Sequence, residues 1–192
     1  MDIACGSRTL VRWRAGVCEG LYGEVVEIGF GTGRNIDFYP RSVHTVAAVE
    51  PSLASMRLAR ARVASAATKI VHVGLAGESL ELDNERCDGA LCTFTLCTVR
   101  DPNLVLREVR RVLRPGGVLH FLEHGVAPVA NVERWQWRLD PFQQRLAGGC
   151  HLTRDPVTMI EQSGFDVEVL EQRFASGPKP WTFFTLGRAT KR

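Results

Sequence analysis

The chain has 192 residues, enough for one compact domain with a hydrophobic core and too few for two full domains. Hydrophobic residues make up 45% of it and charged residues 23%, an ordinary globular composition that excludes disordered and fibrous proteins. The 24 Lys and Arg residues barely outnumber the 21 Asp and Glu residues, and this small excess predicts no nucleic-acid partner.

The cysteines and the hydropathy bear on where the protein works. None of the six cysteines forms a CxxC pair, so the common zinc and thioredoxin patterns are absent and no metal is expected. A chain of this length does not need disulfide bonds, which favours reduced thiols and a cytoplasmic location. No apolar stretch approaches the roughly 18 residues of a membrane span, and the N-terminus lacks the apolar core of a signal peptide.

Short β-rich segments alternate with helical patterns along the first two thirds of the chain. Helices are predicted at 52–66, after Ser52, and at 102–113, after Asp101. A third helix begins near Thr153 to Pro156, with Thr153 as its expected cap. The predicted strands are 24–29, 45–50, 69–73, 89–95, 117–123, 165–170 and 181–186. The first five form βαβ units and hence a doubly wound parallel sheet, whereas the last two are close enough for an antiparallel pair.

Such sheets bind ligands at the carboxyl ends of their strands, which directs attention to the loop after the first strand. Gly29, Gly31 and Gly33 alternate there after Glu27, and glycines allow a tight turn and a close approach of backbone to ligand. The dinucleotide fingerprint needs a glycine at position 34, where the chain has an arginine. The loop therefore favours a ligand without phosphates over a nicotinamide dinucleotide, although an oxidoreductase remains an alternative.

The second strand ends in Glu50, which is followed directly by Pro51. A carboxylate at this position accepts hydrogen bonds from both hydroxyls of a ribose. The sequence therefore predicts a nucleoside between the glycine loop and Glu50.

These features resemble class I S-adenosylmethionine-dependent methyltransferases, and more narrowly the alkyl-thiol methyltransferase-like group with its methyltransferase type 11 domain. The resemblance covers about residues 20–188. It rests on the glycine loop, on Glu50 and on these segments of the second half: 96–99, 113–117, 123–124, 139–141 and 149–154. It implies a single α/β domain over residues 1–192, with a Rossmann-like, doubly wound, mostly parallel sheet of seven strands whose last strand is antiparallel.

The resemblance also implies the cofactor, S-adenosylmethionine, with S-adenosylhomocysteine as the product. It assigns the methionine portion to the glycine loop and to the end of the fourth strand, the ribose to Glu50, and the adenine border to 76–78. The implied cofactor residues are Glu27, Gly29, Phe30, Gly31, Gly33, Asn35, Glu50, Pro51, Ala76, Gly77, Glu78, Thr93, Phe94 and Thr95. Where many members carry an aspartate this chain has Ala76, so either Glu78 or backbone atoms contact the adenine.

Candidate catalytic residues follow the fourth and fifth strands. His124 is interpreted as a base or as an orienting group for the acceptor, or else as a cap of its loop. Asp140 either pairs with Arg154, which is the favoured reading, or orients a substrate. Cys150 is interpreted as a small buried hydrophobe, because methyl transfer from a sulfonium needs no covalent intermediate.

Residues 125–153 are predicted to form a substrate lid, and their Trp135, Trp137 and Phe142 either line it or belong to the core. The expected partner is a small hydrophobic methyl acceptor, a thiol first by resemblance. A lipid amine or quinone-type acceptor, or a fold that binds the cofactor without transfer, are the alternatives. The segment 7–19 is either a helix that closes over the cofactor or a loose end, and its Arg12, Trp13 and Arg14 are the residues for a peripheral membrane contact as the alternative.

Overall fold

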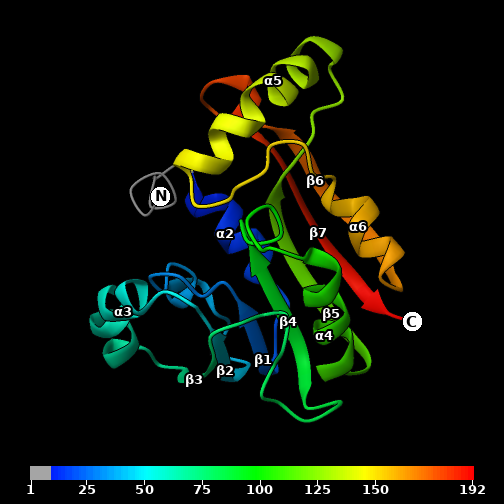
Figure 1. Ribbon diagram of the computed structural model, residues 1–192. Coiled ribbons are helices and arrows are strands. Elements are labelled where there is room, and N and C mark those ends of the chain that lie inside the picture. The colour runs from blue at the N-terminus through cyan, green and yellow to red at the C-terminus, as the bar shows by residue number, and fades with distance from the viewer. Residues whose placement is uncertain (1–9) are drawn as a thin grey trace.

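The computed structural model describes residues 10–192, and seven of its segments form one sheet in the order β3-β2-β1-β4-β5-β7-β6 (Figure 1). The strands are β1 Gly23–Ile28, β2 Val43–Val49, β3 Lys69–Gly74, β4 Cys87–Thr93, β5 Leu113–His124, β6 Phe165–Phe174 and β7 Phe183–Lys191. The first five pair in parallel, and β7 runs antiparallel to both of its neighbours. The predicted fold class is confirmed.

The helices predicted after the second, fourth and fifth strands are present, and a further helix precedes β1. The helices are α2 Val11–Cys18, α3 Leu53–Ser65, α4 Pro102–Val112, α5 Ala130–Leu146 and α6 Pro156–Gln162, with short 3-10 turns η2 Ile36–Phe38 and η3 Lys179–Trp181. Ser52 caps α3 by accepting a hydrogen bond from the Ser55 amide, and Asp101 caps α4. The expected cap of α6 was wrong: Asp155, not Thr153, accepts hydrogen bonds from the first amides of that helix.

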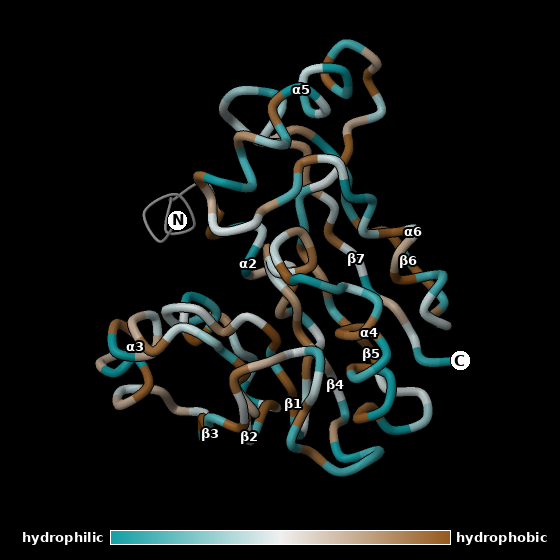
Figure 2. Tube along the Cα trace, in the orientation of Figure 1, coloured by the Kyte–Doolittle hydropathy of each residue, from teal (hydrophilic) through white to brown (hydrophobic). Residues whose placement is uncertain are grey.

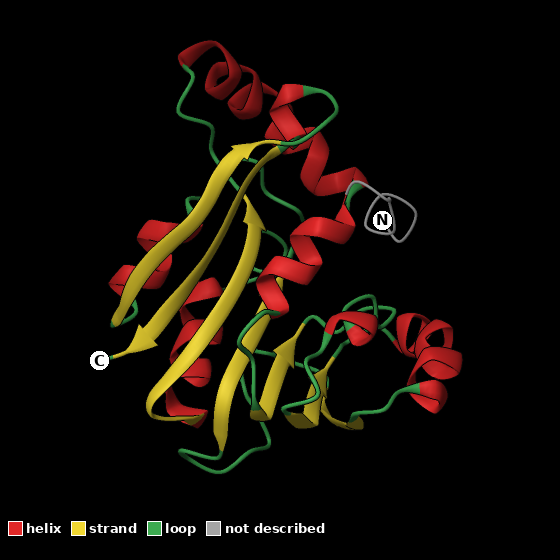
Figure 3. Ribbon diagram, turned by 180° about the vertical axis from the view of Figure 1, so that it is seen from behind, coloured by secondary structure: helices red, strands yellow, loops and turns green. Residues whose placement is uncertain are grey.

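Helices cover both faces of the sheet, as Figure 3 shows from behind. Val26 and Cys92 pack in the core beneath α4 and α6, whereas Val25 and Leu91 pack with α2 on the other face. Neighbouring residues of one strand thus enter different cores, because side chains alternate across a strand. Burial on both faces is why the central strands consist of small and branched apolar residues rather than a polar–apolar alternation.

The segment of the predicted lid lies beyond the carboxyl ends of β4 and β5, where α5 projects from the sheet (Figure 1). Hydrophilic and hydrophobic residues interleave along this helix in Figure 2. Trp135, Trp137 and Phe142 are 54%, 60% and 63% exposed, so the alternative that placed them in the core is wrong. Gln136 instead anchors the helix, because its buried amide accepts from the Ala127 amide and donates to two carbonyls.

At the other end of the described chain, α2 packs on the sheet. Trp13 is buried edge-to-face against Phe184 with ring centroids 5.7 Å apart, and Arg14 is also buried. Neither side chain is therefore available for the membrane contact considered for this segment, whereas Arg12 is exposed. Residues 7–9 of that segment lie outside the described residues. Among residues 10–192, no helix combines the length and apolarity needed to cross a bilayer.

Candidate active site

A cavity of about 610 Å³ opens at the carboxyl ends of β1, β2 and β4. This position is the switch point of the sheet, since β2 and β4 lie on opposite sides of β1 and the connections there run in opposite directions. Twelve of the predicted cofactor residues line the cavity: Gly29, Phe30, Gly31, Asn35, Glu50, Pro51, Ala76, Gly77, Glu78, Thr93, Phe94 and Thr95. Glu27 and Gly33 do not line it.

The glycine loop has a conformation that other residues strain to adopt. Gly29 has φ +72°, and a Cβ there would lie 2.2 Å from Thr95 Oγ1, so this glycine allows β1 and the loop after β4 to approach each other. Gly31 has φ +58°, and the nearest heavy atom to a Cβ there is the Gly29 carbonyl oxygen at 3.8 Å. Gly31 therefore leaves open space on the cavity side.

Glu27 lies under the loop rather than in the cavity. Asn35 Nδ2 donates to Glu27 Oε1 (2.8 Å) and the Tyr39 hydroxyl donates to Oε2. Asn35 also accepts from Arg14 Nη1 (2.6 Å) and so joins the carboxylate to α2. Burial raises the pKa of Glu27 to about 7, against the opposing effect of the Tyr39 hydrogen bond. The carboxyl thus positions Asn35, which does line the cavity.

Gly33 likewise serves the loop itself. A Cβ there would lie 2.8 Å from Ile36 Cδ1, so the glycine makes room for the side chain that begins η2. The sequence pattern predicts Gly33 as a cofactor contact because all three alternating glycines look alike, and only the packing separates them.

Glu50 combines two functions at the end of β2. Its Oε2 accepts from the Gly31 amide and its Oε1 from the Ser52 amide, both at 2.8 Å. Because a carboxylate has about four acceptor sites, each oxygen keeps a lone pair for a further donor. The carboxylate therefore ties the glycine loop to the start of α3 and still presents acceptors to a diol in the cavity.

The far wall of the cavity comes from the segments after β3 and β4. Ala76 and Glu78 line it beside Leu75, which follows β3 directly and is 53% exposed. Phe94 has φ +53°, a strained conformation for a residue with a side chain, and such strain is often concentrated at functional sites. Its ring contacts Phe184 edge-to-face at 5.1 Å.

Several lining residues were missed from the sequence. They are Arg14, Ile28, Thr32, Arg34, Val49, Ser52, Ser55, Leu75, Thr98, Val99, Arg100 and Gly148. Ile28, Val49 and Leu75 occupy strand ends and were detectable from that position alone. Gly148 was not, because the segment after α5 reaches the cavity only through the tertiary fold. Arg14 lies in α2, and its place in the cavity wall agrees with the alternative in which the segment 7–19 forms a helix over the cofactor.

Glu123 is a buried acid that the sequence reasoning did not select. Its Oε1 accepts from the amides of Thr95 (2.8 Å) and Leu96 (3.0 Å), while its Oε2 has no hydrogen-bond partner among the described residues. Burial raises its pKa, against these two hydrogen bonds. Glu123 thereby holds the loop after β4, which supplies the floor of the cavity, on the end of β5.

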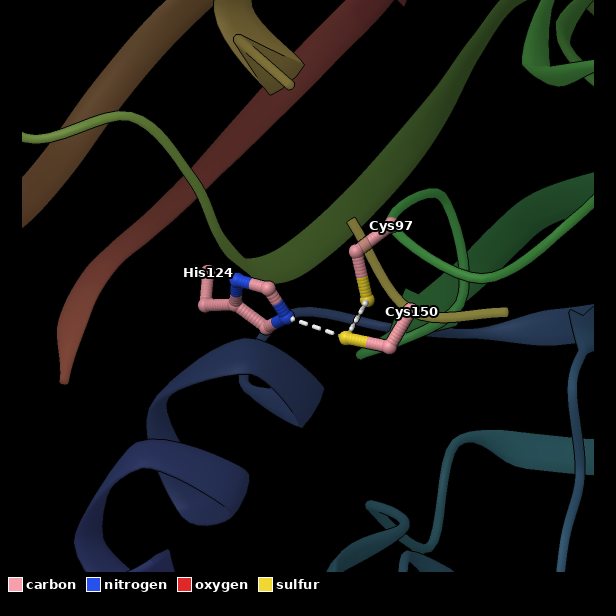
Figure 4. A group of neighbouring side chains, drawn as sticks. All are labelled: Cys97, His124 and Cys150. Carbon is pink, nitrogen blue, oxygen red and sulfur yellow. Dashed lines mark hydrogen bonds between the residues drawn. The ribbon is translucent and has the colours of Figure 1, made fainter. Parts of the chain in front are cut away.

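His124 does not line the cavity and belongs instead to a cluster with two cysteines (Figure 4). Its Nε2 lies 2.9 Å from Cys150 Sγ, which lies 3.7 Å from Cys97 Sγ. The hydrogen bonds to Cys97 and His124 lower the pKa of the Cys150 thiol, and the same contact with Cys150 raises that of Cys97. Cys150 is buried, as expected, but it is a hydrogen-bonded thiol rather than only a small apolar side chain.

Asp140 is buried and holds the segment after α5. Its Oδ1 accepts from the Leu152 amide (2.5 Å), and its Oδ2 from Gln144 Nε2 (2.6 Å), with His151 Nδ1 3.3 Å away. The expected pair with Arg154 is wrong among the described residues: Arg154 Nη1 donates to the carbonyls of Leu96 and Val99. With both oxygens engaged and no place in the cavity wall, Asp140 is a positioning residue.

Comparison with known proteins identifies the family. A family model described as a methyltransferase domain matches residues 26–121, which include the glycine loop, Glu50 and β4. The rat thiol S-methyltransferase TMT1B is 35% identical over 170 residues, covering 85% of this chain and 66% of that protein. The chain belongs to the methyltransferase family.

Two further similarities widen this picture. A phosphatidylethanolamine N-methyltransferase from Cereibacter sphaeroides is 28% identical over 178 residues, covering 86% of this chain and 80% of that protein. The crystal structure of an S-adenosylmethionine-dependent methyltransferase from Thermotoga maritima shares the fold, with a TM-score of 0.69 and 24% identity. The match covers 100% of this chain and 92% of that chain. This chain spans about two thirds of the length of the rat thiol S-methyltransferase.

Membership in this family confirms the expected cofactor, S-adenosylmethionine, and the cavity fits it. Gly31 leaves open space where backbone meets ligand, Glu50 keeps acceptors for a ribose, and the volume suits a molecule of this size. The apolar side chains of Ile28, Val49 and Leu75 in the wall suit a planar base. The residue-by-residue cofactor contacts remain predictions.

Proposed function

We propose that this methyltransferase transfers a methyl group from S-adenosylmethionine to the sulfur of a small hydrophobic thiol. The proposal rests on the cavity at the strand ends, where Gly31 leaves open space and Glu50 keeps acceptors for a ribose. It also rests on the 35% identity of the chain to a thiol S-methyltransferase. When bound, S-adenosylmethionine supplies an activated methyl group on a sulfonium, so the protein's contribution is alignment and the exclusion of water.

The described residues are placed to align the two reactants, while the cofactor supplies the activated methyl group. Glu50 and the glycine loop hold one end of the cavity, while Glu123 fixes the amides after β4 at the other. The acceptor needs only to lose its thiol proton, because a thiolate is nucleophilic enough unaided. The five cysteines of the described chain are all free, which supports the proposed cytoplasmic, reducing location.

The segment 125–153 supports the proposal of a substrate cover within a single domain. α5 carries exposed Trp135, Trp137 and Phe142 on the side of the molecule where the parallel strands end. The helix is anchored by buried Gln136 and exposes these aromatic side chains among arginines, and the aromatic side chains suit an acceptor that is itself apolar. This arrangement favours alkyl thiols over small charged ones.

A lipid amine is the second candidate acceptor, favoured by the 28% identity to a phosphatidylethanolamine N-methyltransferase. The test is methylation of matched panels with labelled S-adenosylmethionine: alkyl thiols of increasing chain length, the corresponding amines, phosphatidylethanolamine in vesicles, and a quinol. Turnover on thiols, rising with chain length, is expected. Turnover on amines or quinols alone would overturn the thiol proposal, and cofactor binding without turnover on any panel would indicate a binding protein.

A further inference from the structure

Two cysteines and a histidine, side chains that can bind a metal ion, meet beside the cofactor cavity. They come from three segments that are far apart in the sequence. Cys97 follows β4, His124 ends β5, and Cys150 lies between α5 and α6. Figure 4 shows the two sulfur atoms and the imidazole Nε2 pointing toward one another. One atom of each residue lies within 4.8 Å of the others. Each residue also lies in one of the segments that carry the resemblance to alkyl-thiol methyltransferases.

The separation of the two sulfurs matches that of a thiolate–imidazole zinc site. Zinc bonds of about 2.3 Å to sulfur and 2.0–2.1 Å to nitrogen, at tetrahedral angles, place two sulfurs about 3.8 Å apart and a sulfur and nitrogen about 3.6 Å apart. The two sulfurs here lie 3.7 Å apart. Nε2 lies 2.9 Å from Cys150 Sγ, a hydrogen-bond distance, so zinc binding replaces this hydrogen bond and moves the imidazole about 0.7 Å away from the sulfur.

Backbone hydrogen bonds hold the three segments together. The His151 amide donates to the Cys97 carbonyl (2.7 Å), which ties the Cys150 segment to the loop after β4. The Val126 amide donates to the Arg154 carbonyl (3.0 Å), which ties the same segment to the end of β5. The ligands are thus pre-positioned by rigid elements, as a metal site requires. When Nε2 is the ligand, the neutral ring carries its proton on Nδ1, which is buried and has no hydrogen-bond partner among the described residues.

The cluster supplies three ligands and leaves a fourth position to another molecule. Among residues 10–192, no other histidine, cysteine or carboxylate joins the group. Structural zinc sites are closed by four protein ligands, whereas catalytic sites use three and keep one position open. Thr98 lies in the cavity wall with its Oγ1 3.4 Å from Cys97 Sγ, so the cluster is one side chain away from the cofactor cavity.

The open position suits a thiol by its chemistry. Zinc binds thiolate sulfur, and a thiol that coordinates it loses its proton. The Arg154 guanidinium, which binds the carbonyls of Leu96 and Val99, lies beside the cluster and interacts electrostatically with both cysteines and with the carboxyl groups of Asp140 and Glu123.

We propose that Cys97, His124 and Cys150 bind one Zn²⁺ ion, and that the thiol of the methyl acceptor occupies its fourth position. On binding, the S–H bond of the acceptor breaks, its sulfur bonds to zinc, and the proton passes to solvent. The second half of this proposal rests on the proposed thiol function. The wide separation of the three residues, at positions 97, 124 and 150, explains why no zinc pattern is visible in the sequence.

The test begins with metal content and affinity. The full chain, purified under reducing conditions, is dialysed against Zn²⁺ and measured by mass spectrometry of the metal and by competition with a chromophoric chelator. One zinc per chain is expected. Cys97→Ser, His124→Gln and Cys150→Ser should each weaken zinc binding by roughly a hundredfold or more, while Cys87→Ala, a buried cysteine outside the cluster, should not. Equal affinity in all four variants, or a Cys97–Cys150 disulfide with no zinc affinity after reduction, would overturn the site.

Replacing zinc by Co²⁺ adds a readout that does not depend on activity. A thiolate-to-cobalt charge-transfer band and the intense visible bands of tetrahedral cobalt are expected, and an alkyl thiol should change them. Thiol methylation that persists in a fully metal-depleted sample would overturn the metal proposal and leave the thiol function standing. Tight cobalt binding without any thiol turnover would instead contradict the proposed function, with the metal site intact.

Discussion

Replacement of Glu50 by alanine tests the ribose assignment and the loop architecture together. Each carboxylate oxygen accepts one backbone amide at 2.8 Å, from Gly31 and from Ser52, and keeps one lone pair for a ribose hydroxyl. Alanine removes all of these acceptors. Two hydrogen bonds from the diol to a charged group are together worth about 1.5–3 kcal/mol after solvation, so the dissociation constant for S-adenosylhomocysteine should rise roughly 10- to 150-fold.

The same substitution leaves two amides without their acceptor, and this cost appears in a different measurement. About 1–3 kcal/mol of unfolding free energy should be lost for each amide that stays shielded from water. Glu50→Gln separates the two effects, since its amide keeps one acceptor oxygen and should give an intermediate affinity. Glu24→Gln, which breaks a surface ion pair with Arg86, is the matched control and should leave affinity unchanged.

Titration calorimetry with S-adenosylhomocysteine measures the affinity, and urea unfolding of the unliganded proteins measures the stability. The reasoning is refuted if Glu50→Ala binds within twofold of the wild type while remaining folded. Loss of affinity in Glu24→Gln as well would show that the effect is not specific to the diol. Loss of stability without loss of affinity would mean that Glu50 only ties the loop to α3.

Three other predictions concern the loop, a buried histidine and the exposed helix. Gly31→Ala and Gly116→Ala both place a Cβ at positive φ with no protein atom closer than 3.8 Å, so each should lower the unfolding free energy by about 1 kcal/mol. Calorimetry should show that only Gly31→Ala abolishes cofactor binding. Burial lowers the pKa of His120 from 6.5 to about 4, so the unfolded chain takes up a proton at this residue before the folded protein does as the pH falls. Between pH 7 and pH 5 the unfolding free energy of the wild type, measured in urea, should therefore fall by about 2 kcal/mol more than that of His120→Asn. An equal pH dependence of the unfolding free energy in the two proteins would contradict this. Trp137→Ala should raise KM for long-chain thiols several-fold while changing kcat and stability little, because the side chain is 60% exposed; an unchanged KM would remove α5 from the acceptor site.

The sequence by itself determined the architecture and one half of the site. The periodicities that predict strands and helices are local in the sequence. Because βαβ connections are almost always right-handed, the order of these elements along the chain restricts the sheet to one topology. Three glycines after β1 and an acid after β2 converge because parallel strands end at the same edge. This convergence places the glycine loop and Glu50 in the cavity wall, whereas the segments 76–78 and 93–95 were expected there from the family resemblance; together 12 of the 14 predicted cofactor residues line the cavity.

Only the tertiary structure decided which side chains meet across the remaining elements. Glu27 and Gly33 look like cofactor contacts in the pattern, yet packing against Asn35 and Ile36 places them beneath the loop. The side chains of Cys97, His124 and Cys150 approach one another only because the segment after α5 folds back over the ends of β4 and β5. Such contacts depend on the path of long connections, which residue spacing along the chain does not encode.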